Sequence, residues 1–144
     1  MQRSISILAI VLLAATLPAA AQQGSQPGFA CQTLVHRQIL KGESPPLHVR
    51  VLKQTYFPGK ASLPHRHQAG EILYVISGSG TNRMNGKTTR LVAGHALVIP
   101  ADVEHEIAGT GANGVTLLAV QMSDVATPFV KPRAGHQNPG ACSD

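Results

Sequence analysis

Residues 59–78 of the chain read GKASLPHRHQAGEILYVISG. His65 and His67 are separated by one residue in this stretch, and side chains on a strand alternate between its two faces, so both imidazoles are predicted to point the same way. Glu71 follows after Gly70, where the chain can bend. The stretch therefore predicts that imidazole and carboxylate groups gather on one side of a strand and of the bend that follows it.

A second stretch, residues 94–105, reads GHALVIPADVEH and places His105 just after a Pro-Ala-Asp turn. Three neutral imidazole nitrogens and one carboxylate oxygen form a donor set for a borderline divalent cation. In an octahedral shell, four protein ligands leave two positions open for water, dioxygen or substrate, which is typical of a reactive site. We predict one divalent transition metal per chain (Fe, Mn, Ni, Cu or Zn), held by His65, His67, Glu71 and His105.

The rest of the sequence is typical of an all-β fold. Short apolar runs are cut by turn residues about every ten positions, and no long 3.6-residue apolar period occurs. Asn85-Gly86 lies between two such runs and predicts a hairpin with a type I′ turn. A run at 72–76 is predicted to end at Gly78-Ser79-Gly80. The remaining predicted strands cover residues 33–40, 47–57, 81–84, 87–92, 96–99, 103–108 and 115–121.

The two histidine-bearing stretches resemble the paired signature motifs of the cupin superfamily. The first motif places Gly59, His65, His67, Glu71 and Gly78 at the family spacing. In the second, the family usually has Gly where this chain has Asp102, and Asn where it has Gly109; neither departure removes a metal ligand. The resemblance implies a single-domain cupin, a double-stranded β-helix or jelly-roll barrel, with the four residues named above as metal ligands. It is nearly silent on the reaction, because cupins carry many activities.

The beginning of the chain has the pattern of a secretory signal peptide. Arg3 precedes an apolar run from Ile5 to Leu17, and small residues close it near Ala21. The run is shorter than the ~20 residues of a membrane span, and Cys31 lies too far downstream for a lipoprotein. We expect a secreted or periplasmic protein with no membrane attachment after cleavage. The expected segments are a signal peptide at 1–21, a flexible segment at 22–32, the barrel at 33–123 and a tail at 124–144.

The charge pattern limits the classes of expected partner, and the two cysteines bear on a possible disulfide. The formal net charge is +5, but the basic residues are scattered and aromatic residues are few, so no nucleic-acid partner is expected. A small organic ligand is the expected partner, and a homodimer is left open. Cys31 and Cys142 are the two cysteines, and in an oxidising compartment they are most simply a disulfide, the alternative being two free thiols on the tails.

The residues that line the pocket are predicted from the strands that flank the motifs. The polar candidates for contact with a substrate are Gln54, Tyr56, Tyr74 and Gln121, although a single bulge would reverse the direction of a side chain. Apolar neighbours predict a mostly apolar cavity: Leu73, Val75, Val98, Leu117 and Val120. Four other histidines are interpreted as surface or turn residues, and two glutamates as facing away from the site: His36, His48, His95 and His136, with Glu104 and Glu106.

Three alternative functions are compatible with these residues. The first is a metal-dependent oxidoreductase of the dioxygenase type, similar to quercetin-dioxygenase-like cupins of type 2, in which Glu71 could double as a catalytic base. The second is a binding module that holds a metal or a small ligand without turnover. The third is an isomerase or lyase, which ranks lower because no cluster of Arg and Lys accompanies the motifs to hold an anionic substrate.

Overall fold

The structure is a computed structural model, and it describes residues 24–26, 28–38, 46–124, 128–134 and 142. The predicted signal peptide lies outside these residues. Within the part of the chain that is described, no helix has the length and apolar character needed to cross a membrane. The elements of the described residues are strands: β1 (Gly24–Gln26), β2 (Phe29–Gln38), β3 (Leu47–Tyr56), β4 (His65–Arg66), β5 (Glu71–Met84), β6 (Lys87–Val92), β7 (Ala96–Ile99), β8 (His105–Gly109), β9 (Val115–Asp124) and β10 (Lys131–Pro132).

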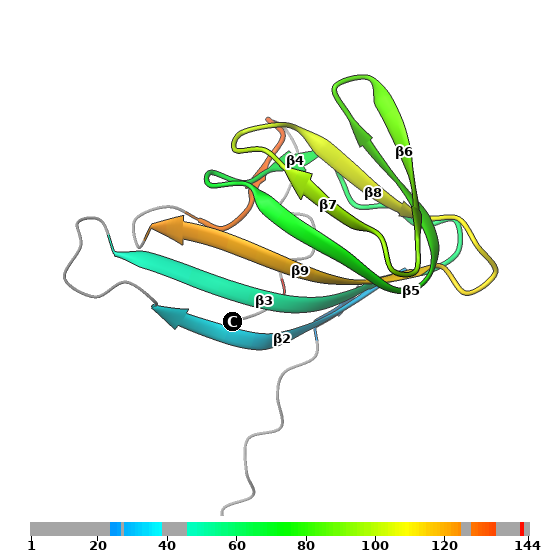
Figure 1. Cartoon of the computed structure of the whole chain (residues 1–144), viewed down its shortest axis with the longest axis horizontal. Helices are drawn as coiled ribbons and strands as arrows, with labels where there is room; N and C mark the ends of the chain where they lie inside the picture. Colours follow the sequence, from blue (N-terminus) through cyan, green and yellow to red (C-terminus); the bar gives the residue numbers. More distant parts are fainter. Residues whose placement is uncertain (1–23, 27, 39–45, 125–127, 135–141, 143–144) are drawn as a thin grey trace, which may run out of the picture.

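The strands form one curled sheet, so the predicted all-β class is confirmed. Its order is β1-β2-β3-β9-β5-β8-β4-β10, with β6 and β7 also pairing with β5. Strands β2, β3, β9 and β7 belong to one wall, and β6, β8, β4 and β10 belong to the other (Figure 1). Strand β5 belongs to both walls, because its first half pairs with β7 and β9 and its second half pairs with β6 and β8.

The predicted end of a strand at Gly78-Ser79-Gly80 is wrong, because β5 runs through these residues to Met84. The pairing with β9 shifts register between Val75 and Ser77, and Gly78 follows with a φ of 77°. A side chain on Gly78 would meet the carbonyl oxygen of Gly114. The glycine therefore bends one long strand from one wall to the other.

The hairpin at Asn85-Gly86 is confirmed. Both residues have positive φ, 51° and 72°, as a type I′ turn requires, and they connect β5 to β6.

The expected boundaries of the barrel are wrong at its beginning. The flexible segment expected at 22–32 instead contributes β1 and the start of β2, which pairs with β3 from Phe29 onward. At the other end, Lys131 and Pro132 of the expected tail pair with β4 as β10. Strands β1, β2 and β10, which lie outside the expected barrel in whole or in part, therefore belong to the sheet that surrounds the site.

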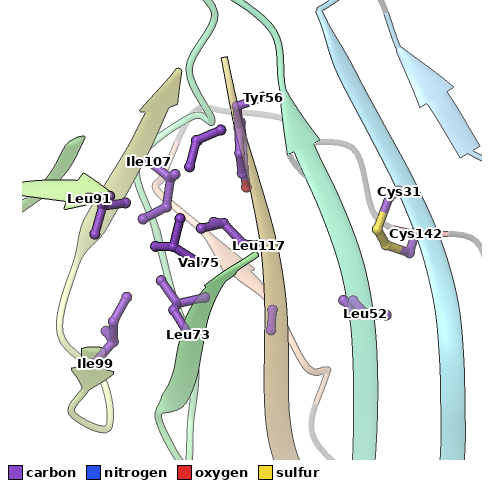
Figure 2. Close-up of a cluster of buried hydrophobic side chains, with 12 residues drawn as sticks. Cys31, Leu52, Tyr56, Leu73, Val75, Leu91, Ile99, Ile107, Leu117 and Cys142 are labelled. Carbon is purple, nitrogen blue, oxygen red and sulfur yellow. A yellow bond between two sulfur atoms is a disulfide. The ribbon is translucent and has the colours of Figure 1, made fainter. Parts of the chain in front are cut away.

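The interior divides into an apolar part and a polar part. Along β9 burial alternates, so Val115, Leu117 and Ala119 point into the core, and Gln121 and Ser123 follow them on the same face. Leu73, Val75, Ile99 and Ile107 also belong to the apolar part, and Figure 2 shows Val75, Ile107 and Leu117 directed toward one another. The polar part holds the candidate metal ligands.

Candidate metal centre

His65 and His67 both point into the barrel, as the alternation of a strand predicts. His65 begins β4 and His67 follows its last residue, and both side chains are buried. Their ring centroids lie 5.1 Å apart. Arg66, which lies between them, points outward, and its Nη2 is 3.6 Å from Oε2 of Glu104.

Glu71 reaches the same space because of a bend at Gly70. Gly70 has a φ of 82°, and a side chain there would lie 2.6 Å from the carbonyl oxygen of Ile99. Only glycine fits this combination of conformation and close approach. The bend starts β5 at Glu71, which directs the first side chain of that strand inward, where it is buried.

His105 starts β8 and pairs directly with His65 across the sheet, with ring centroids 4.3 Å apart. The turn before it holds Asp102 at a φ of 56°, and the amide of Asp102 donates to the carbonyl oxygen of His67 at 2.8 Å. Asp is among the few non-glycine residues that tolerate this conformation, so the departure from the family pattern leaves the turn intact.

Backbone carbonyl groups orient all three imidazoles. Nδ1 of His65 lies 2.7 Å from the oxygen of Leu63, Nδ1 of His67 lies 2.6 Å from that of Phe129, and Nδ1 of His105 lies 3.3 Å from that of Val103. A carbonyl oxygen only accepts, so each Nδ1 carries the proton and donates it. Each Nε2 is left with a lone pair, which is the form in which histidine binds metals.

These Nε2 atoms face the carboxylate of Glu71. Oε2 of Glu71 lies 3.4 Å from Nε2 of His67 and 3.4 Å from Nε2 of His105. Both nitrogens are buried and have no hydrogen-bond partner among the described residues. Lone pairs that face a carboxylate repel it unless a cation or proton lies between them. Two donor atoms bound about 2.1 Å from one ion are separated by about 3.0 to 3.4 Å, so these residues fit a metal ion.

The ligand atoms of His65, His67 and His105 all lie within 4.8 Å of one another, a spacing suited to one metal ion. Burial, together with the neighbouring His105, lowers the pKa of His65 to about 4, so this imidazole is neutral at pH 7. Burial alone would raise the pKa of Glu71, but the imidazoles of His105 and His67 hold it well below its ordinary value. The site therefore places a neutral His65 beside an ionised Glu71.

The pocket candidates divide into three that point inward and one that does not. Gln54, Tyr56 and Gln121 are buried and line a small cavity of about 20 Å³ next to His65. Tyr74 is 47% exposed, because on β5 it alternates with Leu73 and Val75 and points out of the barrel. The prediction that Tyr74 lines the pocket is therefore wrong.

The prediction of a mostly apolar cavity is also wrong. Val98 is 64% exposed on the outer face, while Leu73, Val75 and Leu117 are packed in the core. The lining of the cavity is largely polar: Arg50, Gln54, Tyr56, Ser62, His65 and Gln121, with Phe29, Leu52, Val130 and Cys142. Burial, followed by the charge of Glu71, raises the pKa of Tyr56, which keeps its hydroxyl protonated.

A larger and more open hollow of about 260 Å³ has His105 in its lining. Its other lining residues are mostly charged or polar: Arg83, Glu104, Glu106, Arg133, Asn85 and Gly86, with Pro64 and Met84. Glu106 pairs with Arg83 at 2.9 Å, so Glu104 and Glu106 lie outside the ligand cluster.

Of the remaining histidines, the three that the structure describes do not join the cluster. His95 is exposed next to a turn. His36 and His48 are half-buried with ring centroids 5.8 Å apart, and His36 also contacts the ring of Phe129. His136 lies outside the described residues.

Cys31 and Cys142 are joined by a disulfide, with Cα atoms 5.4 Å apart (Figure 2). Cys142 lines the cavity beside His65, so the bond holds this cysteine next to the site.

Two residues of the site have no motif in the sequence. Arg50 is 4% exposed and donates from Nε and Nη2 to Oε1 of Gln121, at 3.2 and 2.7 Å. Nε2 of Gln121 in turn donates to Oε1 of Glu71 at 2.6 Å. Phe129 contributes the carbonyl oxygen that holds His67. Alternation along β3 would have placed Arg50 on the face of Leu52 and Gln54, but no local signal marks Phe129.

Comparison with known proteins identifies the domain in which these residues lie. The family model described as the cupin domain matches residues 52–121, a range that contains all four candidate ligands. The chain carries a cupin domain. Among curated proteins, no match to this cupin is found.

Solved structures show the same fold. KdgF from Halomonas sp. is 22% identical with a TM-score of 0.53, and the match covers 69% of this chain and 84% of that protein. An RmlC-like cupin from Shewanella frigidimarina is 16% identical with a TM-score of 0.55, and the match covers 83% and 91% of the two chains. Oxalate decarboxylase from Bacillus subtilis is 16% identical with a TM-score of 0.60 over 78% of this cupin, which spans only 30% of that enzyme. At these identities the likeness shows the fold alone, and the resemblance to quercetin dioxygenase stays a prediction.

Proposed function

We propose that this cupin binds one divalent transition metal ion through His65, His67, Glu71 and His105, and uses it as an oxidoreductase on a small organic substrate. The observation that carries the metal site is the pair of buried Nε2 lone pairs, each 3.4 Å from Oε2 of Glu71. When bound, such an ion supplies Lewis acidity and, for Fe, Mn, Ni or Cu, a partner for dioxygen.

The residues of the chain have separate tasks in this proposal. The carbonyl oxygens behind the imidazoles keep each Nε2 directed at the ion. Glu71 stays ionised and supplies the negative charge, while its other oxygen is occupied by Gln121. Protonated Tyr56 offers a hydrogen-bond donor at the cavity beside His65. The open hollow that reaches His105 has the size for a small organic molecule.

Metal analysis of the protein purified from its native compartment tests the metal site. We expect one equivalent of a transition metal, and its loss in His105→Ala and His67→Ala variants that keep the circular dichroism spectrum of a β-protein. An unaltered metal content in both variants would remove these residues from the site. Oxygen uptake by the protein loaded with each metal in turn, assayed with flavonols, catechols and thiols, then tests the reaction.

A second candidate function is a metal-binding module without turnover. The specific observation in its favour is the small size of the cavity beside His65, about 20 Å³, which has room for about one water molecule. Stoichiometric metal that resists chelators, together with no oxygen uptake on any of these substrates, would favour this candidate over the oxidoreductase.

We also propose that the protein acts outside the cytoplasm, in the periplasm or the medium. The Cys31–Cys142 disulfide supports this location, since such bonds persist in oxidising compartments. Fractionation of cells, with determination of the N-terminal residue of the protein, tests the location and the predicted cleavage after Ala21 together.

A further inference from the structure

Arg50, Gln121 and Glu71 occupy one row across three neighbouring strands. Arg50 of β3 pairs directly with Gln121 of β9, and Gln121 pairs directly with Glu71 of β5. All three side chains point inward and are buried. Residues that are directly opposite in adjacent strands are close enough to interact side chain to side chain, so the register of the sheet builds this row.

The chemistry of the row leaves only one orientation for the amide of Gln121. A guanidinium group only donates hydrogen bonds, so the oxygen of Gln121 must face Arg50. The amide nitrogen must then face Glu71, where it donates to Oε1 at 2.6 Å. With Oε1 occupied, Glu71 presents Oε2 to Nε2 of His67 and of His105. Arg50 therefore determines, through Gln121, which oxygen of Glu71 faces the metal position.

Arg50 also contacts the residue that orients His67. Its guanidinium lies over the ring of Phe129, 4.5 Å from the centroid, within the range of a cation–π contact. The backbone oxygen of Phe129 is the acceptor for Nδ1 of His67. One buried side chain thus contacts the residues that hold two of the four candidate ligands.

We propose that Arg50 is the positioning residue of the metal centre, acting on Glu71 through Gln121 and on His67 through Phe129. The inference rests on the proposed function, because it concerns the same metal site. It adds that the centre needs a cation outside the ligand set: through Gln121, Arg50 keeps Oε1 of Glu71 occupied and Oε2 facing the imidazoles, and through Phe129 it orients the ring of His67. Groups that orient ligands in this way typically change metal affinity by about 10- to 100-fold when they are removed.

Cobalt binding tests the proposal, because Co²⁺ reports both affinity and ligand arrangement through its visible absorption. The variants are Arg50→Met, Gln121→Met, Phe129→Leu and their combinations, with Arg50→Lys as the conservative change. Phe129→Leu removes the ring but keeps the carbonyl group. Thr116→Val is the matched control, since it removes a hydrogen bond with Thr55 from the outer face of the same strand.

We expect Arg50→Met and Gln121→Met each to weaken Co²⁺ binding by about 10- to 100-fold and to alter the visible spectrum. Because the two changes interrupt the same route, their combined effect should be smaller than the product of the single effects. Arg50→Met should still weaken binding in the Gln121→Met background, through Phe129, and should have no further effect once Phe129→Leu is added. Arg50→Lys should be intermediate, and Thr116→Val should match the wild type.

The outcomes separate this inference from the proposed function. If the wild type binds no stoichiometric Co²⁺, both are overturned. If the wild type binds Co²⁺ and Arg50→Met binds it with the same affinity and spectrum, the inference alone is overturned. Thermal denaturation of the metal-free proteins monitors folding. Should Arg50→Met not fold, the Arg50→Lys variant and the Arg50→Met/Gln121→Met pair, in which no buried donor loses its acceptor, decide the question.

Discussion

His67 donates from Nδ1 to the backbone oxygen of Phe129 at 2.6 Å, although 62 positions separate the two residues. Phe129 belongs to the segment that continues into β10, and β10 pairs with β4, the strand that carries His65. Residues 129–132 therefore belong to the candidate metal centre and are not an appendage of the barrel. A histidine motif alone would orient only His65 and His105, whose acceptors lie within two residues.

Because Phe129 orients His67, we predict that the Cys31–Cys142 disulfide slows the loss of a bound metal ion. Replacing Cys31 and Cys142 with Ser should lower the free energy of unfolding by about 2 to 4 kcal/mol, because the loop between them is no longer closed in the unfolded chain. Release of metal to a chelator should accelerate, since the segment that holds His67 is less restrained. Urea denaturation and stopped-flow metal release measure the two effects, and reduction of the wild type should reproduce both. Equal release rates with and without the bond would contradict the prediction.

Replacing Glu71 with Gln should weaken metal binding by at least about tenfold while preserving the fold. Gln has the size of Glu, its oxygen can still accept from Gln121, and its amide nitrogen would donate to the lone pairs of His67 and His105 that a metal needs. Titration calorimetry with Zn²⁺ measures the change. Glu106→Gln, which removes an exposed ion pair with Arg83, is the control and should leave the affinity unaltered. An unchanged affinity in Glu71→Gln would exclude Glu71 from the ligands.

Metal affinity should fall as the pH falls, beginning with His67. Burial alone would lower the pKa of His67, but Glu71 beside it and the carbonyl of Phe129 raise it above its ordinary value of 6.5. A proton and a metal ion compete for the same Nε2, so affinity should decline by about tenfold per pH unit below that pKa, where one proton is displaced. The pKa of His65 is about 4, so this residue adds to the decline only near that pH. Zn²⁺ titrations between pH 5.5 and 8 test this, and a constant affinity over that range would refute it.

Gly70→Ala should destabilise the protein more than Gly59→Ala. Both glycines have positive φ, 82° and 70°, so both variants incur backbone strain of about 1 kcal/mol or more. A side chain at Gly70 would also lie 2.6 Å from the oxygen of Ile99, whereas nothing lies within 4 Å of one at Gly59. We expect a loss of about 3 kcal/mol or more for Gly70→Ala, together with weaker metal binding, because the bend that brings Glu71 inward is displaced. Urea denaturation of both variants makes the comparison, and equal losses would show that the close approach is unimportant.

The motifs predicted the candidate ligands because their geometry is local. The spacing of His65 and His67 follows from the period of a strand, and the direction of Glu71 follows from one glycine bend. Only His105 required a second stretch of chain, and the two stretches meet because β4 pairs with β8. The Asn85-Gly86 turn was predictable for the same reason, since positive φ at both positions is a property of those two residues.

Directions along longer strands were harder to predict. The strand pattern predicts Tyr74 in the pocket, but its side chain points outward, while Gln54, Tyr56 and Gln121 point inward. An error of one residue in the starting point of β5 reverses every side chain on it, and that starting point is set by the bend at Gly70 and by pairing with β9. The strand end predicted at Gly78 was wrong for a related reason. A glycine in a strand marks either an end or a bend, and only the contact with the neighbouring Gly114 decides between them.

By itself, the sequence determined the all-β class and the residues proposed to hold the metal, because both depend on periods and spacings within a few residues of each other. Only the tertiary structure decided what surrounds those residues. The row from Arg50 through Gln121 to Glu71 depends on the register of three strands. The contact of Phe129 with His67 depends on how the C-terminal segment returns to the barrel. Register and chain return are set by the packing of the whole sheet, and no short stretch of sequence contains that information.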